Sequence, residues 1–378
     1  MSPDGARPTT VLIVMPLAEQ RGGGELMLRQ LVENGRGRGV EWVVVFLHDG
    51  PMVGEFRRFG LKVVAIEAGR MRDPHRAIAA IAQIARVARR ERATLVLGWM
   101  EKGQVYGGPA AVLARRPAVW FQLGTPRQRS WLASLATALP TRGVITVSRT
   151  GALAQAAMRP SRPQRMVYPG AELDRFDGAL LPLPAELRAR LGLPADGPLV
   201  GIVGRLQRWK GIHVLVDAMA LLRHSHPDAH CVVVGGAHDL EPRYGGEVQR
   251  QVARLGLERH VTLAGFQTNV HDWMQAMDVV VHASDREPFG IVVIEAMALG
   301  KPVVAGSAGG PREIVTDGVD GLLADYGDAP ALAAALRRYL DDPQFASAVG
   351  AAARRRAADF SAPRYAQNVI TALRELCA

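Results

Sequence analysis

The feature that most constrains the fold is an alternation of short apolar runs with segments of helical character. The runs lie at residues 10–15, 42–47, 62–66, 94–97, 118–123, 144–147, 199–203, 231–234, 261–263, 279–281 and 303–304. Runs that are apolar throughout are typical of strands in a parallel sheet covered by helices on both faces. The sequence therefore predicts an α/β protein built from parallel sheets.

The segments between these runs carry helical signals. In residues 74–92, Ile78, Ile81 and Ile84 share one face, and Arg86 lies elsewhere. We expect further helices at residues 25–35, near Glu55, and at 186–191, 212–222, 291–299 and 362–376.

A proline-rich stretch at residues 169–198 interrupts the alternation. The length of 378 residues also suits two domains. We expect two doubly wound Rossmann-like domains, residues 1–172 and 173–361, each with a ligand crevice at the carboxyl ends of its strands. Residues 362–378 are predicted to form a helix that packs back on the first domain.

The amino-acid composition narrows the class of molecule that the protein is expected to bind. The net charge of +10 favours an acidic partner, but only 6% of residues are aromatic and no basic run is interleaved with aromatics, which disfavours nucleic acid. Two cysteines, Cys231 and Cys377, provide neither a disulfide framework nor zinc-ligand spacing. No apolar run reaches about 18 residues, so we expect a cytoplasmic protein.

Residues 125–132 combine cations, a tryptophan and a leucine. Such a segment could touch the inner face of a membrane as a weak peripheral contact, or a lipid-linked acceptor. A solvated helix face is the favoured interpretation.

The sequence from Glu287 to Gly300 predicts an anion site between two acids. A helix beginning after Phe289 and Gly290, at the carboxyl end of a strand, presents free N–H groups that favour a phosphate. Glu287 and Glu295 flank this position, and each carboxylate can accept hydrogen bonds from two neighbouring hydroxyls. A phosphate flanked by two groups that carry neighbouring hydroxyls is the chemical pattern of a nucleotide sugar. The alternative is a helix whose acids merely suit its dipole.

Other motifs follow strands in the same way. Arg205 and Lys210 flank a strand-to-helix junction, where they could hold a diphosphate and neutralise it as it departs; surface cations in a turn are the alternative. Glycine loops include Gly22, Gly23, Gly24 and Gly309, which permit close backbone approach to a ligand. Strand ends in the first domain provide Trp99, Glu101, Lys102, Gln122 and Thr125 as acceptor-side candidates. For Trp99 and Gln122 taken singly, ordinary packing is favoured.

Together and in order, these motifs resemble the family 4 retaining glycosyltransferases, which have the GT-B fold of two domains facing each other across a cleft. Residues 168–176 also resemble the interdomain segment of that family, and residues 317–323 its late turn and strand. The resemblance covers nearly the whole chain and is strongest from 168 to 323.

The resemblance implies a hexosyltransferase that moves sugar from a UDP- or GDP-sugar to an acceptor hydroxyl, with retention and without metal or cofactor. The acceptor would be a glycan, a lipid-linked molecule or a natural product. Glu287 would bind the transferred sugar, Glu295 the ribose, and Arg205 and Lys210 the diphosphate. The remaining donor contacts implied are Gly22, Gly23, Gly24, Phe289, Gly290, Ile291 and Gly309.

One departure from the family concerns Gln122, because many members carry a histidine at this strand end. A glutamine can hydrogen-bond a sugar but cannot act as a base. This departure leaves open a catalytically inactive nucleotide-sugar-binding protein. A nucleotide-sugar epimerase or hydrolase on the same fold is a second alternative.

Overall fold

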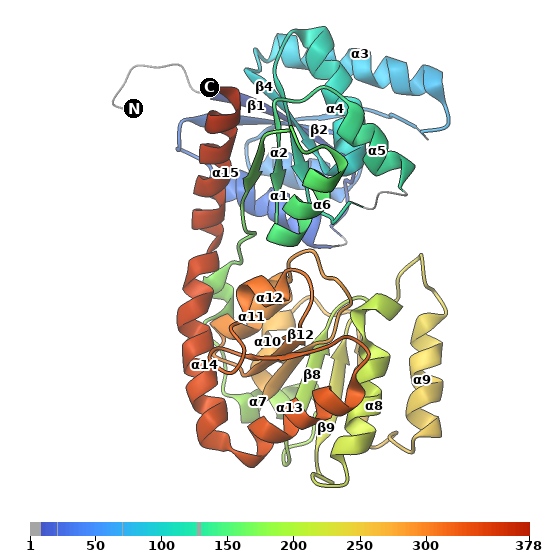
Figure 1. Cartoon of the computed structure of the whole chain (residues 1–378), viewed down its shortest axis with the longest axis vertical. Coiled ribbons are helices and arrows are strands. Elements are labelled where there is room, and N and C mark those ends of the chain that lie inside the picture. The colour runs from blue at the N-terminus through green and yellow to red at the C-terminus, as the bar shows by residue number, and fades with distance from the viewer. Residues whose placement is uncertain (1–8, 21, 70, 127–129) are drawn as a thin grey trace. The chain divides into compact units, whose positions relative to one another are not determined.

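The computed structural model describes residues 9–20, 22–69, 71–126 and 130–378, and it divides the chain into two compact units (Figure 1). Unit 1 comprises residues 1–170 and 362–378, and unit 2 comprises residues 171–361. The boundary between the two units lies two residues before the predicted one, because the backbone of Ala171 pairs with the C-terminal residues of unit 2. Its N–H donates to the carbonyl of Phe360 (2.8 Å), and it forms a parallel bridge with Ser361.

Unit 1 contains a parallel seven-stranded sheet in the order β3-β2-β1-β4-β5-β6-β7. Its strands are β1 (Thr9–Met15), β2 (Val40–Phe46), β3 (Lys62–Ala65), β4 (Leu95–Trp99), β5 (Ala118–Gln122), β6 (Gly143–Thr146) and β7 (Gln164–Met166). The central strands are buried along their length, as their continuous apolar character predicts. The short edge strand β7 has no apolar run and was not predicted.

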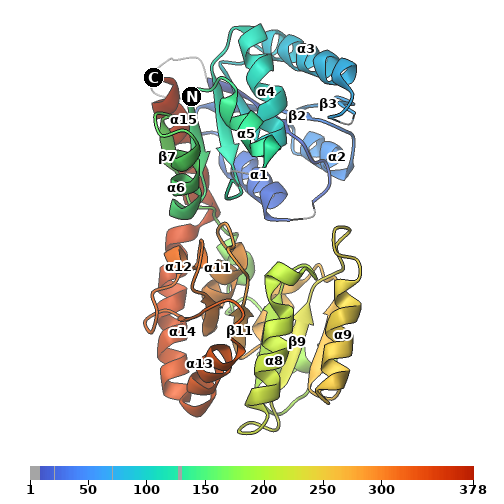
Figure 2. The same cartoon turned by 45° about the vertical axis from the view of Figure 1, so that its right-hand side comes forward.

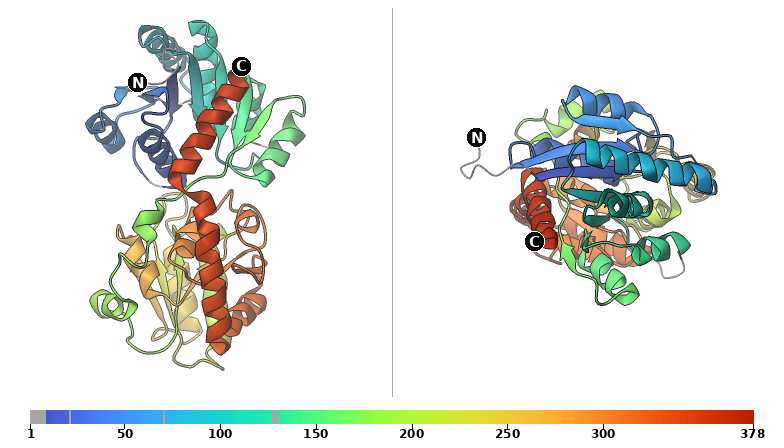
Figure 3. Two further views of the ribbon diagram at one scale, coloured as in Figure 1. Left: turned by 90° about the vertical axis from the view of Figure 1, so that its left-hand side faces the viewer. Right: turned by 90° about the horizontal axis from the view of Figure 1, so that it is seen from above.

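Helices cover the unit 1 sheet on both faces. They are α1 (Gly23–Asn34), α2 (Pro51–Arg58), α3 (Pro74–Arg90), α4 (Met100–Ala114), α5 (Trp131–Ala138), α6 (Arg149–Met158) and α15 (Ala362–Cys377). The C-terminal helix α15, red in Figure 3, packs against α1 and so belongs to unit 1.

Unit 2 has a parallel six-stranded sheet in the order β10-β9-β8-β11-β12-β13. Figure 2 shows this unit with β9 and β11 labelled. Its strands are β8 (Leu199–Val203), β9 (His230–Val234), β10 (Val261–Gly265), β11 (Val279–His282), β12 (Val303–Gly306) and β13 (Leu322–Ala324). Its helices are α7 (Pro184–Leu191), α8 (Ile212–Leu222), α9 (Tyr244–Arg254), α10 (Val270–Ala276), α11 (Ile291–Ala298), α12 (Pro311–Ile314), α13 (Ala329–Asp341) and α14 (Pro343–Ala357). Short 3₁₀ turns lie at Leu173–Phe176, Arg208–Lys210 and Ala358–Phe360.

Both sheets reverse their strand order beside their first strand. In unit 1, β1 lies between β2 and β4; in unit 2, β8 lies between β9 and β11. Ligands of open α/β sheets bind outside the carboxyl ends of the strands at such a reversal. The loops that follow β8 and β11 are therefore the first place to look for a site in unit 2. Within the described ranges, no helix combines the length and apolar character that a membrane span requires.

Candidate functional site

The loops after β8 and β11 are held together by their backbones. Gly211 has a φ of +73°, and a side chain there would place Cβ 2.0 Å from the carbonyl oxygen of Ala283. The N–H of Asp285 donates to the carbonyl of Trp209 (2.7 Å). The loop that carries Lys210 is thus laid directly against the loop that carries Glu287.

Lys210 and Glu287 form an ion pair at this junction. Lys210 Nζ lies 2.5 Å from Glu287 Oε2, and each side chain is only 14% exposed. His282 Nε2 lies 3.3 Å from the same oxygen, and Ser284 Oγ lies 3.2 Å from His282 Nε2. Both contacts to the Glu287 carboxylate use Oε2, so Oε1 retains its capacity to accept hydrogen bonds from a ligand.

The electrostatics of this cluster keep Glu287 ionised. Burial alone would raise the pKa of Glu287, but the charge of Lys210 and the hydrogen bond from His282 outweigh it and hold the pKa well below its ordinary value. A carboxylate with so low a pKa stays ionised and accepts hydrogen bonds, but it is a weak base. The geometry therefore suits binding of hydroxyls better than abstraction of a proton.

The glycine loop after β12 fixes the backbone of Glu287. Gly309 has a φ of +75°, and a Cβ there would lie 2.3 Å from the Glu287 carbonyl oxygen. The N–H of Gly310 donates to that same carbonyl (2.8 Å). A Cβ on Gly310 would lie 2.1 Å from Cα of Phe289. The role that the structure gives Gly309 is thus close packing against the segment that leads into α11.

The N-terminus of α11 has no side-chain cap. Gly290 is the N-cap residue, with a φ of +109°, and the first turn starting at Ile291 is only partly buried. Phe289 is buried against Phe360, with ring centroids 5.8 Å apart. The N–H of Val293 donates to the carbonyl of Gly290 (3.0 Å), so the amides of Ile291 and Val292 are the ones that can receive an anion.

Glu295 lies one turn further along α11 and is half-buried. Burial raises its pKa to about 7; Arg175 opposes this shift and Glu172 reinforces it. Glu287 and Glu295, two acids of one motif, thus differ in protonation near neutral pH.

Arg205 lies toward the other side of β8. Its NH1 is 3.0 Å from Nε2 of His238, in the loop after β9. The N–H of Leu206 donates to the carbonyl of Gly236 (2.9 Å), which ties the two loops together. The structure thus joins Lys210 to Glu287, and it gives Arg205 a separate partner.

In unit 1, Trp99 supports the glycines at the start of α1. Its Nε1 donates to the carbonyl of Gly24 (3.1 Å), and its ring stacks on Phe121 with centroids 4.3 Å apart. Trp99 is 0% exposed, which favours the packing interpretation. Gly22 is the N-cap residue of α1, and Gly23 opens the helix.

Two other acceptor-side candidates have different environments. Glu101 lies in the first turn of α4 and is half-buried. Gln122, at the end of β5, is fully buried, and both polar atoms of its amide lack a hydrogen-bond partner among the described residues. An unpaired buried amide costs free energy, which marks Gln122 among the described acceptor-side candidates.

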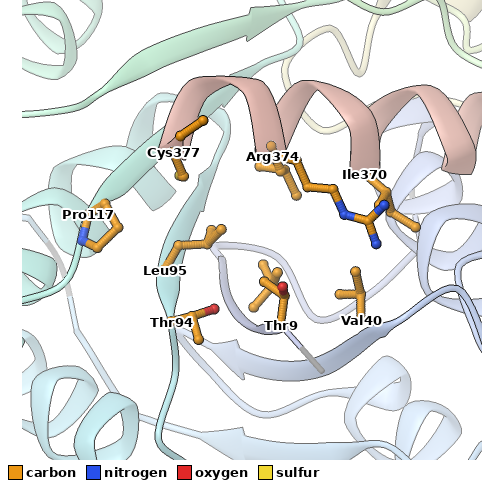
Figure 4. Close-up of a pocket in the computed structure, with 11 residues that line it drawn as sticks. Thr9, Val40, Thr94, Leu95, Pro117, Ile370, Arg374 and Cys377 are labelled. Carbon is orange, nitrogen blue, oxygen red and sulfur yellow. The ribbon is translucent and has the colours of Figure 1, made fainter. Parts of the chain in front are cut away.

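A separate cavity of about 330 Å³ lies in unit 1 at the amino-terminal ends of β1 and β4 (Figure 4). Its lining includes Thr9, Thr94, Ile370, Arg374 and Cys377. Glycine loops and strand-end polar residues follow the opposite, carboxyl ends of the strands. This cavity is therefore not part of the candidate site.

Several members of the unit 2 site were not singled out from the sequence: His282, Ser284, Trp209 and His238. The ring centroid of Trp209 lies 4.1 Å from Lys210 Nζ. A signal for two of them was present, because His282 and Ser284 are polar residues at the carboxyl end of an otherwise apolar strand.

Comparison with known proteins agrees with this geometry. Residues 185–356, most of unit 2, match the family model described as Glycosyl transferases group 1. A D-inositol 3-phosphate glycosyltransferase of Streptomyces avermitilis is 39% identical over 204 residues, which are 52% of this chain and 43% of that protein. The mannosyltransferase LpsB of lipopolysaccharide core biosynthesis in Rhizobium meliloti is 33% identical over 49% of this chain and 53% of that protein. The chain thus matches about half the length of these curated relatives.

Solved structures match over nearly the whole chain. HepE of Anabaena, crystallised with UDP, gives a TM-score of 0.85 at 28% identity, covering 97% of this chain and 100% of that chain. Sucrose-phosphate synthase of Thermosynechococcus elongatus gives a TM-score of 0.81 at 26% identity, covering 97% and 99%.

Proposed function

We propose that this chain, which has the GT-B fold and whose second unit belongs to the glycosyl transferases group 1 family, moves a hexosyl group from a nucleoside diphosphate sugar to an acceptor hydroxyl. The observation that carries the proposal is the cluster of Lys210, Glu287 and His282 beside the uncapped N-terminus of α11. It combines a cation and free amides for phosphate with an ionised carboxylate for sugar hydroxyls.

The donor is proposed to lie along α11. The diphosphate would be bound by the amides at Gly290 and Ile291 and by Lys210, with Arg205 adding a second cation. Glu287 would accept hydrogen bonds from the transferred sugar, and Glu295 from the ribose. HepE has been crystallised with UDP and with UDP-glucose, which supports a UDP-sugar as the donor class.

In the proposed reaction the bond between the anomeric carbon and the diphosphate oxygen breaks, and a bond to the acceptor oxygen forms on the same face of the sugar. The acceptor proton passes to the departing diphosphate. This assignment follows from the low pKa of Glu287, which makes it a poor base. Lys210 and Arg205 would neutralise the developing charge, so we propose that the enzyme needs no metal.

The acceptor is proposed to carry a free hydroxyl on a glycan, a lipid-linked molecule or a natural product. Glu101 and Gln122 remain the unit 1 candidates for contacting it.

Substitution of the ion pair tests the proposed function. We expect Lys210→Ala and Glu287→Gln each to lower kcat/KM at least thirtyfold, or about 2 kcal/mol of transition-state stabilisation. The measurement is transfer of labelled sugar from UDP-glucose to a panel of acceptors. Arg250→Ala and Glu258→Gln, which change exposed residues of unit 2, are the controls.

Either of two results would contradict the proposed transfer reaction and support another function. Release of free sugar or of an epimerised nucleotide sugar at full rate without acceptor would indicate a hydrolase or an epimerase. Nucleotide-sugar binding with no turnover on any acceptor would indicate a binding protein.

A further inference from the structure

One tryptophan of the chain lies beside a charged group of the candidate site. Four of the six tryptophans are buried: Trp42, Trp99, Trp120 and Trp273. Trp131 is exposed on α5, within the predicted membrane-contact segment 125–132, of which residues 127–129 lie outside the described ranges. Trp209 is half-buried in the loop after β8. In the part of the chain that the structure describes, it is the one tryptophan with a cation over its ring.

The backbone of the turn that carries Trp209 is fixed by three other loops. Arg208 and Trp209 lie in one 3₁₀ turn. The N–H of Asp285, after β11, donates to the carbonyl of Trp209 (2.7 Å), and the hydroxyl of Tyr326, after β13, donates to the carbonyl of Arg208 (3.3 Å). The N–H of Arg208 donates to the carboxylate of Glu241 in the loop after β9 (2.8 Å). The indole ring is therefore attached to a backbone that has little freedom to shift.

The ammonium of Lys210 contacts both this ring and the carboxylate of Glu287. Its Nζ lies 4.1 Å from the centroid of the Trp209 ring and 2.5 Å from Glu287 Oε2. The side chain of Lys210 is only 14% exposed, so these two groups take the place of much of the water around the charge. A cation over the face of an indole ring is attracted by the quadrupole of the ring, and the attraction is stronger where water is excluded.

The ring holds the charge of Lys210 without accepting a conventional hydrogen bond. An ammonium has three N–H donors, and the hydrogen-bond partner of Lys210 Nζ among the described residues is Glu287. The lysine stem is flexible, so contacts at its end decide where the charge lies. The ring thus fixes the position of the ammonium, and donors remain for the oxygens of a ligand.

We infer that Trp209 is a positioning residue for Lys210: the indole ring holds the ammonium where it binds the diphosphate of the donor. The inference rests on the proposed function, because that function assigns Lys210 to the diphosphate. The alternative is that the indole only fills space beside the loop. A space-filling role predicts the same loss of affinity whether or not residue 210 is charged.

A double-mutant cycle between Trp209 and Lys210 separates these two roles. The dissociation constants of UDP and GDP are measured by titration calorimetry for the wild type, Trp209→Leu, Lys210→Met and the double variant. These nucleotides carry the diphosphate without the sugar. Lys210→Met removes the charge and keeps an unbranched stem beside the ring. We expect Trp209→Leu to weaken binding about tenfold when Lys210 is present and less than about twofold when residue 210 is methionine.

A conservative substitution provides a second test of the ring. Trp209→Phe keeps an aromatic face beside the ammonium, so the dissociation constant should stay within about threefold of the wild-type value. A loss as large as that of Trp209→Leu would contradict the positioning role. The urea unfolding midpoint of each variant without nucleotide shows whether the fold is retained.

Phe345→Leu is the matched control. Phe345 is half-buried in unit 2, and Cζ of Arg338 lies 4.0 Å from the centroid of its ring. The ring therefore has a cation at nearly the same distance as Trp209 does, but it lies on α14, outside the loops of the candidate site. We expect this substitution to leave the affinity for UDP and GDP unchanged.

The outcomes separate the inference from the proposed function. Wild-type affinity in Lys210→Met would contradict the donor site itself. If Lys210→Met weakens binding, two results would overturn the inference alone: wild-type affinity in Trp209→Leu, or an equal loss from Trp209→Leu with and without the charge at residue 210. A loss that requires the ammonium would support the positioning role.

Discussion

One carboxylate oxygen, Oε2 of Glu287, is shared by Lys210 and His282. Burial of a charge that has a single partner costs free energy, and a second hydrogen-bond donor lowers that cost. His282 is only 3% exposed and contacts the proposed sugar-binding group Glu287, so we assign it a positioning role for Glu287.

The positioning role predicts a difference between two substitutions of His282. His282→Ala should lower kcat/KM about tenfold. It should also raise the pKa of Glu287, so that the acid limb of the pH profile moves to higher pH. His282→Gln keeps a donor near the position of Nε2 and should restore most of both. Wild-type kcat/KM and an unmoved acid limb in His282→Ala would rule the role out.

Glu295 predicts a pH dependence of stability. Its folded pKa of about 7 lies above the ordinary value of 4.5, so the folded state holds a proton that the unfolded chain has lost. The free energy of unfolding should therefore fall as pH rises from 4.5 to 7 and then level off. Glu295→Gln should remove this fall and stabilise the protein at pH 8 by about 1–2 kcal/mol.

Urea unfolding of the wild type and Glu295→Gln at pH 5 and pH 8 measures this effect. Equal pH slopes in the two proteins would contradict it. Glu287 acts in the opposite sense: its lowered pKa contributes stability that is complete above about pH 4.5 and is lost only as the pH falls below that value.

The loops after β8 and β11 meet at a glycine, Gly211, where an added side chain would collide with the backbone of the other loop. Gly211 and Gly192 both have positive φ, +73° and +66°, but only Gly211 has a backbone atom within reach of an added Cβ. Gly192→Ala should cost about 1 kcal/mol, the strain of a left-handed residue. Gly211→Ala should cost at least about 2 kcal/mol more, because the loop must move away from Ala283.

Chemical denaturation of both glycine variants tests the contact between these loops. Equal losses of stability would mean that the loop of Lys210 is free to shift. Loss of donor binding in Gly211→Ala alone would link the junction to the site.

Among the elements, strands were predicted better than helices. The apolar runs locate eleven of the thirteen strands from local pattern alone, and residues 317–323 locate β13 from the resemblance. The helix α4 has no comparable signal. It contains Gly103, Gly107, Gly108 and Pro109, which are poor helix formers, and most of it is buried, so it lacks a polar face.

At the scale of the whole molecule, the order of the strands in the sheet decides which loops meet at the candidate site. The residue types and their positions after strands could be predicted from the sequence, because ligands gather at the carboxyl ends of parallel strands. Which side chains meet could not be predicted, because strand order decides it. The pairing of Lys210 with Glu287 depends on β8 lying beside β11, and that of Arg205 with His238 on β8 lying beside β9.

The charge distribution is also a property of the whole chain. Composition gives a net charge of +10, but only the sequence order shows that the excess lies in residues 102–170 of unit 1. Unit 2, which is proposed to bind the anionic donor, therefore relies on a few placed cations such as Lys210 rather than on bulk charge.

The most direct test of the account is the unfolding midpoint of the protein with a panel of nucleotides and nucleotide sugars. A donor at about 100 times its dissociation constant should add about 2.7 kcal/mol and raise the midpoint by several degrees. We expect a selective shift with UDP or GDP and their sugars in the wild type and a much smaller one in Lys210→Ala. No shift with any nucleotide, or an equal shift in Lys210→Ala, would contradict the assignment of the donor site to the loops after β8 and β11.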